Sequence, residues 1–176
     1  QEIRQANEQL AQAQRELDER KVPRGDKVQV GIMVETPAAA IIADELAREA
    51  DFFSIGSNDL IQYTLAADRQ NERVAAVFDS FHPAVLRLID TTIAAGREAG
   101  IEVGLCGEMA GDPLATPLLL GLGLQKFSMA ALSLPAVKEK VRTWSLDAAR
   151  SLARQALELS SGEEVQTLVL NWGDGA

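Results

Sequence analysis

Short apolar runs alternate along this chain with longer segments in which apolar residues recur at the spacing of an α-helix. Four of these runs have the length of buried strands and end at glycine or polar residues; they cover residues 28–34, 51–55, 101–105 and 125–129. The helical spacing predicts helices over residues 38–50, 84–99, 114–123, 134–144 and 146–159. This alternation favours an α/β fold with parallel strands and right-handed crossovers.

The two ends of the chain lie outside this alternation. Residues 1–20 are rich in Gln, Glu, Ala and Leu, and their apolar stripe predicts a mostly solvated helix lying on a larger body. Because this helix is already under way at Gln1, we expect the chain to be a piece of a longer polypeptide. Residues 171–176 are expected to form a tail that is frayed or left from cloning, and residues 1–170 to form one partial domain.

Polar residues follow each of the four predicted strands. In α/β barrels the carboxyl ends of the strands face the active site, so polar residues at four successive strand ends would form one site. These residues are Glu35, then Ser57, Asn58 and Asp59, then Cys106, Gly107 and Glu108, and finally Ser128 and Met129.

Glu35 and Asp59 each close an apolar run, and a helix-length segment separates the two runs. Such an arrangement would place both carboxylates on the same rim of a parallel sheet. Hard oxygen ligands suit Mg²⁺, so the pair predicts a magnesium site. Taken separately, each residue has a simpler interpretation, Glu35 as an acid at a helix N-terminus and Asp59 as the cap of a turn.

Two further residues are candidates for chemistry at this rim. The thiol of Cys106 could donate or accept a proton, although a lone cysteine at a strand end is more often a small buried hydrophobe. Arg69 lies within residues 60–74, which we expect to form a long loop, and it could hold a phosphate or carboxylate with two hydrogen bonds. The alternative for Arg69 is a surface ion pair with Asp68 or Glu72.

Composition narrows the class of protein. The 176 residues suffice for one hydrophobic core but fall short of the about 250 residues of a complete eight-stranded barrel. A net charge of −9 argues against a nucleic-acid or membrane footprint, and no apolar run approaches the roughly 18 residues of a membrane span. A single cysteine excludes an internal disulfide and no signal peptide opens the chain, so the expected location is the cytoplasm.

Three segments, in order, carry a family resemblance: GIMVETPAAAIIADELAREADFFSIGSNDLIQYTLAADRQN, GLCGEMAGDP and KFSMAALSLP. They closely resemble enzyme I of the bacterial phosphoenolpyruvate-dependent phosphotransferase system, and the likeness extends to about residue 170. The resemblance implies the C-terminal half of that family's phosphoenolpyruvate-binding barrel, a TIM-type (β/α)8 fold. Half a barrel agrees with the four βα units found in the pattern.

The resemblance also implies roles for individual residues. Glu35 and Asp59 match the family's Mg²⁺ ligands, in its VETP and G-T-N-D motifs. Asn58 and Arg69 match residues that hold the phosphoryl group. Cys106 matches the cysteine that protonates the enolate when phosphoenolpyruvate gives up its phosphoryl group.

Four neighbouring positions complete this comparison. Gly107 and Glu108 match residues that line the same pocket. Ser57 stands where the family usually has threonine, a change that keeps the hydroxyl. Ala130 stands where the family often has a second serine, so any hydrogen bond from that position is lost here.

The implied activity is Mg²⁺-dependent phosphoryl transfer from phosphoenolpyruvate to a histidine of the same enzyme, with release of pyruvate. It is the first step of the sugar phosphotransferase system. In the family the histidine belongs to a separate N-terminal domain, and a downstream phosphocarrier protein is the next partner. His82, the only histidine in this chain, could be mistaken for the acceptor, but a His-Pro pair before a helical run is typical of a helix start.

Two other interpretations compete with this one. Pyruvate phosphate dikinase and phosphoenolpyruvate synthase share the barrel and its ligands, although the segment QYTLAADRQN fits enzyme I better. Alternatively, the chain is a catalytically incomplete module for ligand binding or oligomerisation. An isolated half-barrel exposes sheet edges and apolar surface, which also predicts a homo-oligomer.

Overall fold

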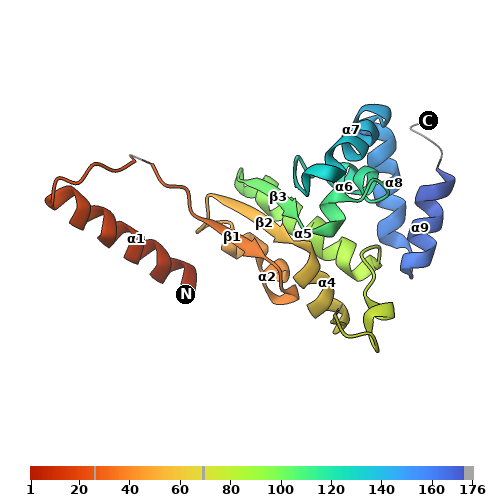
Figure 1. Cartoon of the computed structure of the whole chain (residues 1–176), viewed down its shortest axis with the longest axis horizontal. Helices are drawn as coiled ribbons and strands as arrows, with labels where there is room; N and C mark the ends of the chain where they lie inside the picture. Colours follow the sequence, from red (N-terminus) through yellow and green to blue (C-terminus); the bar gives the residue numbers. More distant parts are fainter. Residues whose placement is uncertain (26, 69, 173–176) are drawn as a thin grey trace.

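The computed structural model describes residues 1–25, 27–68 and 70–172, and its strands form one parallel sheet in the order β1-β2-β3-β4 (Figure 1). The strands are β1 (Gly31–Val34), β2 (Phe52–Gly56), β3 (Glu102–Cys106) and β4 (Lys126–Ser128). All four coincide with the apolar runs of the sequence, so the predicted α/β fold with parallel strands is confirmed.

Helices precede, join and follow these strands. The α-helices are α1 (Glu2–Glu19), α2 (Pro37–Ile41), α3 (Ala43–Leu46), α4 (Ser57–Leu65), α5 (Pro83–Ala99), α6 (Thr116–Leu122), α7 (Leu134–Thr143), α8 (Leu146–Glu158) and α9 (Gly162–Asn171). Short 3₁₀ turns are η1 (Ala75–Val77), η2 (Glu108–Gly111) and η3 (Ala131–Ser133). Of the described helices, none is both long and apolar enough to cross a membrane.

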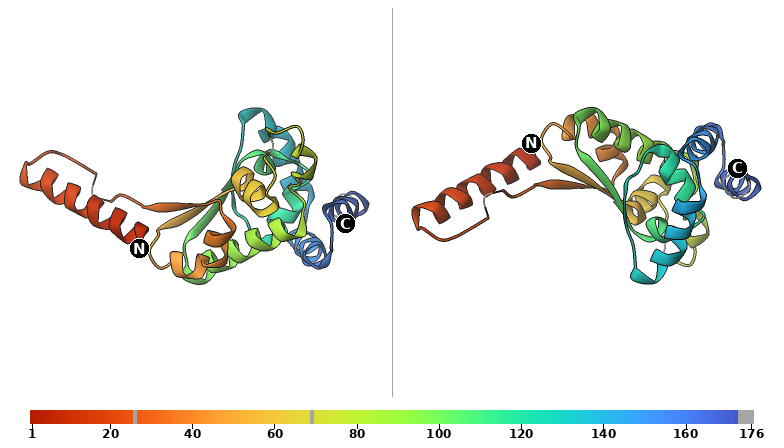
Figure 2. Two further views of the ribbon diagram at one scale, coloured as in Figure 1. Left: turned by 90° about the horizontal axis from the view of Figure 1, so that it is seen from below. Right: turned by 90° about the horizontal axis from the view of Figure 1, so that it is seen from above.

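Within the part of the chain that the structure describes, helices cover one face of the sheet and not the other. On the covered face, a Cβ on Gly96 of α5 would collide with the side chain of Val103, which places α5 directly against β3. Figure 2 shows α5, in green, along this side of the strands. On the other face Met33 is 48% exposed, and Lys126 pairs with Glu102 at 2.6 Å in solvent. Parallel sheets are normally covered on both faces, so this open face is unusual.

Helix α1 extends away from the sheet (Figure 1), and near its last residues Asp18 pairs with Arg24 of the following segment at 2.7 Å. Its first residues meet the body formed by the sheet and its helices. There Arg4 pairs with the carboxylate of Glu49 at 2.7 Å, and the Asn7 amide donates to the Glu49 carbonyl at 3.0 Å. No residue of α1 is buried. The predicted solvated helix is thus confirmed, while its contact with the body is limited to one end.

Two helix predictions need correction in the first half of the chain. Residues 38–50, expected to be one helix, contain α2 and α3 with a break at Ile42. The expected loop 60–74 begins instead as the last two turns of α4. Leu60 and Ile61 are no more than 1% exposed, and this burial outweighs the polar character of the residues that follow.

Helix α9 is absent from the sequence-based prediction. It begins with a capping box, in which the Ser161 hydroxyl accepts from the Glu164 amide and the Glu164 carboxylate accepts from the Ser161 amide, both at 3.2 Å. Asn171 is the last residue of this helix and Trp172 packs against the core, although both were expected in the tail. Residues 173–176 lie outside the described residues.

Helix α5 begins as the His-Pro pair predicts. The imidazole Nδ1 of His82 accepts a hydrogen bond from the Ala84 amide at 3.2 Å, and Pro83 is the first helical residue. Gly100, with φ of 71°, ends the helix in a left-handed conformation that suits glycine. His82 therefore caps a helix.

Asp90 of α5 provides a prediction about stability. Burial raises the pKa of its half-buried carboxyl, and Arg97 opposes part of this rise. The folded state therefore binds a proton at Asp90 more tightly than the unfolded state does. The stability that this proton binding contributes is lost as the pH rises through the pKa of Asp90 in the folded state. Asp90→Asn should increase the free energy of unfolding at pH 7, by up to about 0.5 kcal/mol, and should have a smaller effect at pH 4.

Urea unfolding of both proteins at the two pH values measures this difference. Glu98→Gln, which removes an exposed carboxylate of the same helix, is the matched control. A benefit of Asp90→Asn that is equal or greater at pH 4 would contradict the assignment of the effect to burial.

Candidate functional site

The carboxyl ends of three strands meet at one rim of the sheet. Gly56, Cys106 and Ser128 are aligned partners across β2, β3 and β4. Helix α4 begins immediately after β2, and the hydroxyl of Ser57, which is fully buried, donates to the Cys106 carbonyl at 2.7 Å. This bond holds the first turn of α4 against the end of β3.

The segment after β3 wraps around the same helical turn. Gly107 has a φ of 105°, and a Cβ there would collide with the Ser57 hydroxyl and lie 3.1 Å from Asn58 Oδ1. Glycine is therefore required at this position both by its backbone and by its neighbours. Asn58 Oδ1 accepts a hydrogen bond from the Glu108 amide at 3.2 Å, which closes the turn.

A pocket of about 390 Å³ opens at this rim. It brings together six of the strand-end residues that the sequence predicts for the site, along with residues of the 3₁₀ turns. Its lining residues are Asn58, Cys106, Gly107, Glu108, Gly111, Ser128, Met129, Ala130 and Ser133.

The thiol of Cys106 sits between three strands and is only half-buried. Its Sγ lies 3.9 Å from the Sδ of Met33 on β1 and 3.8 Å from the Oγ of Ser54 on β2. It also lines the pocket, so it differs from a cysteine packed wholly in the core. A thiol in this position can exchange a proton with a bound molecule.

Glu35 and Asp59 lie at the same end of the sheet. Val34 pairs with Ile55, which brings Glu35 level with Gly56, and the Glu35 Oε2 lies 2.9 Å from where a Cβ of Gly56 would be. Gly56 therefore leaves space for this carboxylate. Asp59 is exposed in the first turn of α4.

These two carboxylates are a suitable but incomplete ligand set for Mg²⁺. In the part of the chain that the structure describes, no three His, Cys, Asp or Glu side chains converge as a metal site. Mg²⁺ usually keeps several waters and takes one or two carboxylates together with phosphate oxygens of a substrate. The donor chemistry of Glu35 and Asp59 fits that requirement. Arg69, the other predicted anion-binding residue, lies outside the described residues.

Comparison with known proteins assigns the chain to a family. Residues 1–146 match the family model described as PEP-utilising enzyme, PEP-binding domain. The chain belongs to this family. The match includes both strand-end carboxylates and the whole of the pocket, so the predicted family resemblance is confirmed.

Several curated relatives share the name phosphoenolpyruvate-protein phosphotransferase. The protein of Geobacillus stearothermophilus is 48% identical over 168 residues, which cover 96% of this chain and 29% of the relative. That of Buchnera aphidicola is 45% identical over 171 residues, covering 97% and 30%. That of Bacillus subtilis is 51% identical over 144 residues, covering 82% and 25%. The chain thus spans less than a third of the length of these relatives.

The sequence-based prediction overlooked several residues of this site. Met33 on β1 and Ser54 on β2 contact Cys106 on β3. The alternation of side chains along a strand could have identified them, because it turns every second side chain to the open face of the sheet. Gly111 and Ser133 approach each other across the pocket wall, where the Ser133 Oγ lies 2.9 Å from a Cβ position on Gly111. No local sequence pattern predicts this contact, because Gly111 and Ser133 belong to two separate 3₁₀ turns.

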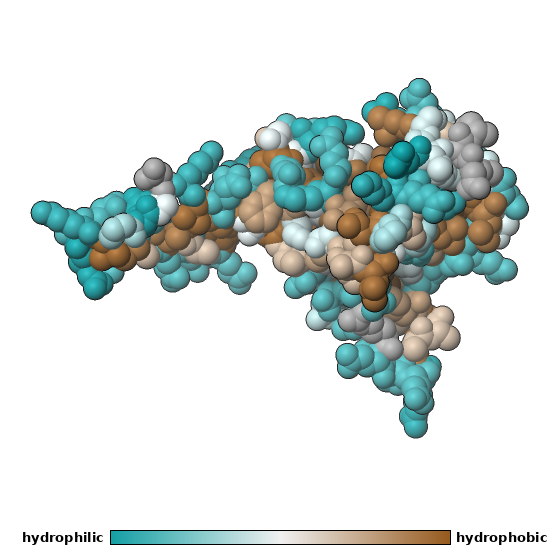
Figure 3. Space-filling model, turned by 45° about the horizontal axis from the view of Figure 1, so that its top comes forward, coloured by the Kyte–Doolittle hydropathy of each residue, from teal (hydrophilic) through white to brown (hydrophobic). Residues whose placement is uncertain are grey.

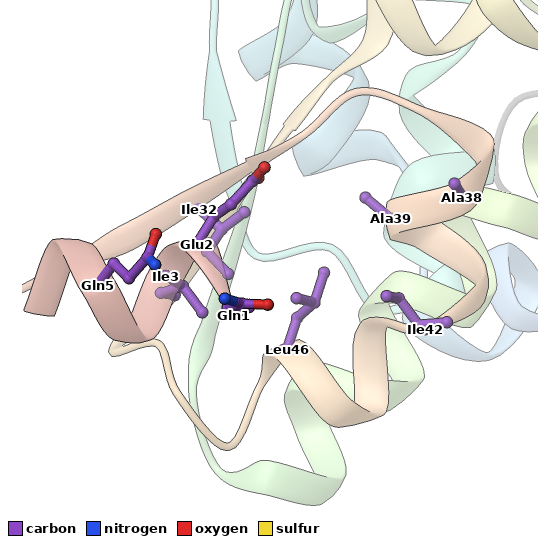
Figure 4. A pocket seen from close by; sticks show the side chains of 9 residues that line it. All are labelled: Gln1, Glu2, Ile3, Gln5, Ile32, Ala38, Ala39, Ile42 and Leu46. Carbon is purple, nitrogen blue, oxygen red and sulfur yellow. The ribbon is translucent and has the colours of Figure 1, made fainter.

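A larger cavity, of about 740 Å³, lies elsewhere. Figure 4 shows it between the first residues of α1 and the side chains of Ile32, Ile42 and Leu46. Its polar side chains are those of Glu2 and Gln5 from α1 and of Gln1, the N-cap of that helix. None of the residues predicted for the site lines it, so its size does not make it the functional site.

Proposed function

We propose that the full-length protein containing this chain transfers a phosphoryl group from phosphoenolpyruvate to one of its own histidines and releases pyruvate. The reaction would be Mg²⁺-dependent and would start a sugar phosphotransferase system. One observation supports this most strongly: Cys106, Asn58 and Glu108 line one pocket at the carboxyl rim of a sheet in a phosphoenolpyruvate-binding family.

We also propose that the sheet is half of a (β/α)8 barrel. Its parallel strands have one face without helices, and that face carries Met33, Ser54 and Cys106. In a closed barrel this face would point inward, and further strands would pair with the free edges of β1 and β4. Those strands would come from the part of the relatives that this chain does not span.

Glu35 and Asp59 are the residues that would hold Mg²⁺. Both end a strand or begin the helix after it, on the rim that also carries the pocket. When bound, the ion neutralises charge on the oxygens of the phosphoryl group. The chain would then need its own groups to orient the rest of the ligand.

Neutral hydrogen-bond donors and Arg69 would together orient the bound phosphoenolpyruvate. Among the described residues that line the pocket, none is lysine or arginine, and Glu108 contributes a carboxylate. The chain as a whole has a net charge of −9, which would repel an anionic ligand. The guanidinium of Arg69 would therefore compensate the phosphoryl charge, while the Asn58 amide would donate a hydrogen bond to it.

Cys106 would supply the proton that completes the reaction. The bond between phosphorus and the enol oxygen breaks as phosphorus bonds to the acceptor imidazole nitrogen. The pyruvate enolate then takes the Sγ proton of Cys106 at its C3 atom, which leaves a thiolate to be reprotonated from solvent. His82 would not be the acceptor, because its Nδ1 accepts from the Ala84 amide as the cap of α5. The acceptor would belong to an N-terminal domain, and a phosphocarrier protein would follow.

Pyruvate release from phosphoenolpyruvate by the full-length protein tests this function. Release should require both Mg²⁺ and the phosphocarrier for multiple turnovers, and it should stop when the metal is chelated. A protein that releases no pyruvate, or that uses ATP and phosphate as a dikinase would, is inconsistent with the proposal.

The 176-residue chain by itself should behave differently from the full-length protein. We expect it to bind phosphoenolpyruvate weakly or not at all and to self-associate, because its sheet edges and one sheet face are open. Val28 and Met33 are 50% and 48% exposed, and Figure 3 shows hydrophobic residues along α1 and on the adjoining surface. Formation of a homo-oligomer through these exposed surfaces is the second candidate function.

Light scattering and calorimetric titration with phosphoenolpyruvate and Mg²⁺ measure the two properties. A monodisperse monomer with micromolar affinity, about −8 kcal/mol, would contradict the half-barrel proposal. The full-length protein is the control for the binding measurement.

A further inference from the structure

The turn after β4 places a second hydroxyl at the pocket. The Ser133 amide donates to the Ala130 carbonyl at 3.0 Å, which closes the 3₁₀ turn η3. In a 3₁₀ helix, residues three apart lie on the same face, one above the other. Ala130 and Ser133 accordingly both line the pocket, whereas Leu132 between them is 95% exposed.

The hydroxyl of Ser133 is directed to the pocket wall. Its Oγ lies 2.9 Å from the position that a Cβ of Gly111 would occupy, and Gly111 lines the same pocket. The side chain of Ser133 is half-buried. Its Oγ makes no hydrogen bond with another described residue. A hydroxyl that lines a pocket and has no protein partner is available to donate a hydrogen bond to a molecule bound there.

We propose that Ser133 is a substrate-binding residue whose hydroxyl donates a hydrogen bond to a carboxylate or phosphoryl oxygen of the bound anion. This inference rests on the proposed function, because that function supplies the anionic ligand. The described lining residues include no cation, so each neutral donor in the pocket contributes a larger share of the binding.

Titration of the full-length protein with phosphoenolpyruvate in the presence of Mg²⁺ tests the assignment. Ser133→Ala should weaken binding about tenfold, the effect of one lost hydrogen bond to a charged group. The double variant A130S/S133A moves the hydroxyl from position 133 to position 130. It should restore most of the affinity, because both positions face the same pocket. Leu132→Ala in the same turn should leave binding unchanged.

Steady-state kinetics add a second readout. A rise in KM with unchanged kcat indicates a bond to the carboxylate, which does not react, whereas a fall in kcat indicates a bond to the transferring group. Ser133→Ala with wild-type affinity and kinetics overturns the proposal, and so does an A130S/S133A protein as weak as S133A. A wild-type protein that fails to bind phosphoenolpyruvate refutes the proposed function itself, and this inference with it.

Discussion

Glu35→Ala and Asp59→Ala should each reduce Mg²⁺-dependent pyruvate release by the full-length protein at least about 100-fold. Each substitution removes one of the two carboxylates that we propose as ligands of the ion. A single remaining carboxylate would place the ion poorly against the phosphoryl oxygens. Pyruvate formation at ordinary Mg²⁺ concentration measures the effect.

Isosteric variants separate metal binding from structure. Asp59→Asn and Glu35→Gln preserve shape, and part of their lost activity should return at high Mg²⁺ if the defect is weak metal binding. Asp44→Ala, at an exposed acid of α3, should keep full activity. If Asp59 only favours the N-terminus of α4, its removal would lower the free energy of unfolding by about 0.3–1 kcal/mol and leave turnover near normal.

Cys106→Ala should slow pyruvate formation at least about 100-fold while leaving the affinity for phosphoenolpyruvate nearly unchanged. The thiol would act only after the phosphoryl group has left, so its loss affects chemistry and not ground-state binding. Pyruvate release and calorimetric titration on the same preparation measure the two quantities.

Two controls address the alternative that Cys106 is a packing residue. Met33→Leu removes the neighbouring sulfur at 3.9 Å but keeps the thiol, and it should retain most of the rate. Circular dichroism melting of Cys106→Ala shows whether the protein still folds. Unchanged catalysis, or loss of folding together with loss of activity, would support the packing role.

The strands were predictable here because a strand buried in an α/β sheet appears in the sequence as a short run of apolar residues. A glycine or a polar residue usually follows such a run. Val34, Ile55 and Leu105 are no more than 1% exposed, and each lies within such a run. Polar residues at the ends of the runs then pointed to the rim, because parallel strands share their carboxyl ends.

Helix boundaries were less predictable because they depend on contacts between distant residues. Helix α4 exists despite the polar segment after it, since Leu60 and Ile61 are buried in the core. Helix α9 is a different case, because its capping box of Ser161 and Glu164 is a local signal that the sequence-based prediction overlooked.

The sequence by itself determined the four strands, most of the helices between them and the family, because these depend on local periodicity and on motifs. Only the tertiary structure decided that Ser57 and Gly107 lock the first turn of α4 to β3 and that Ser133 reaches Gly111. It also decided that one face of the sheet stays open. Such contacts depend on how separate elements pack, and residues far apart in the chain carry no local signal of one another.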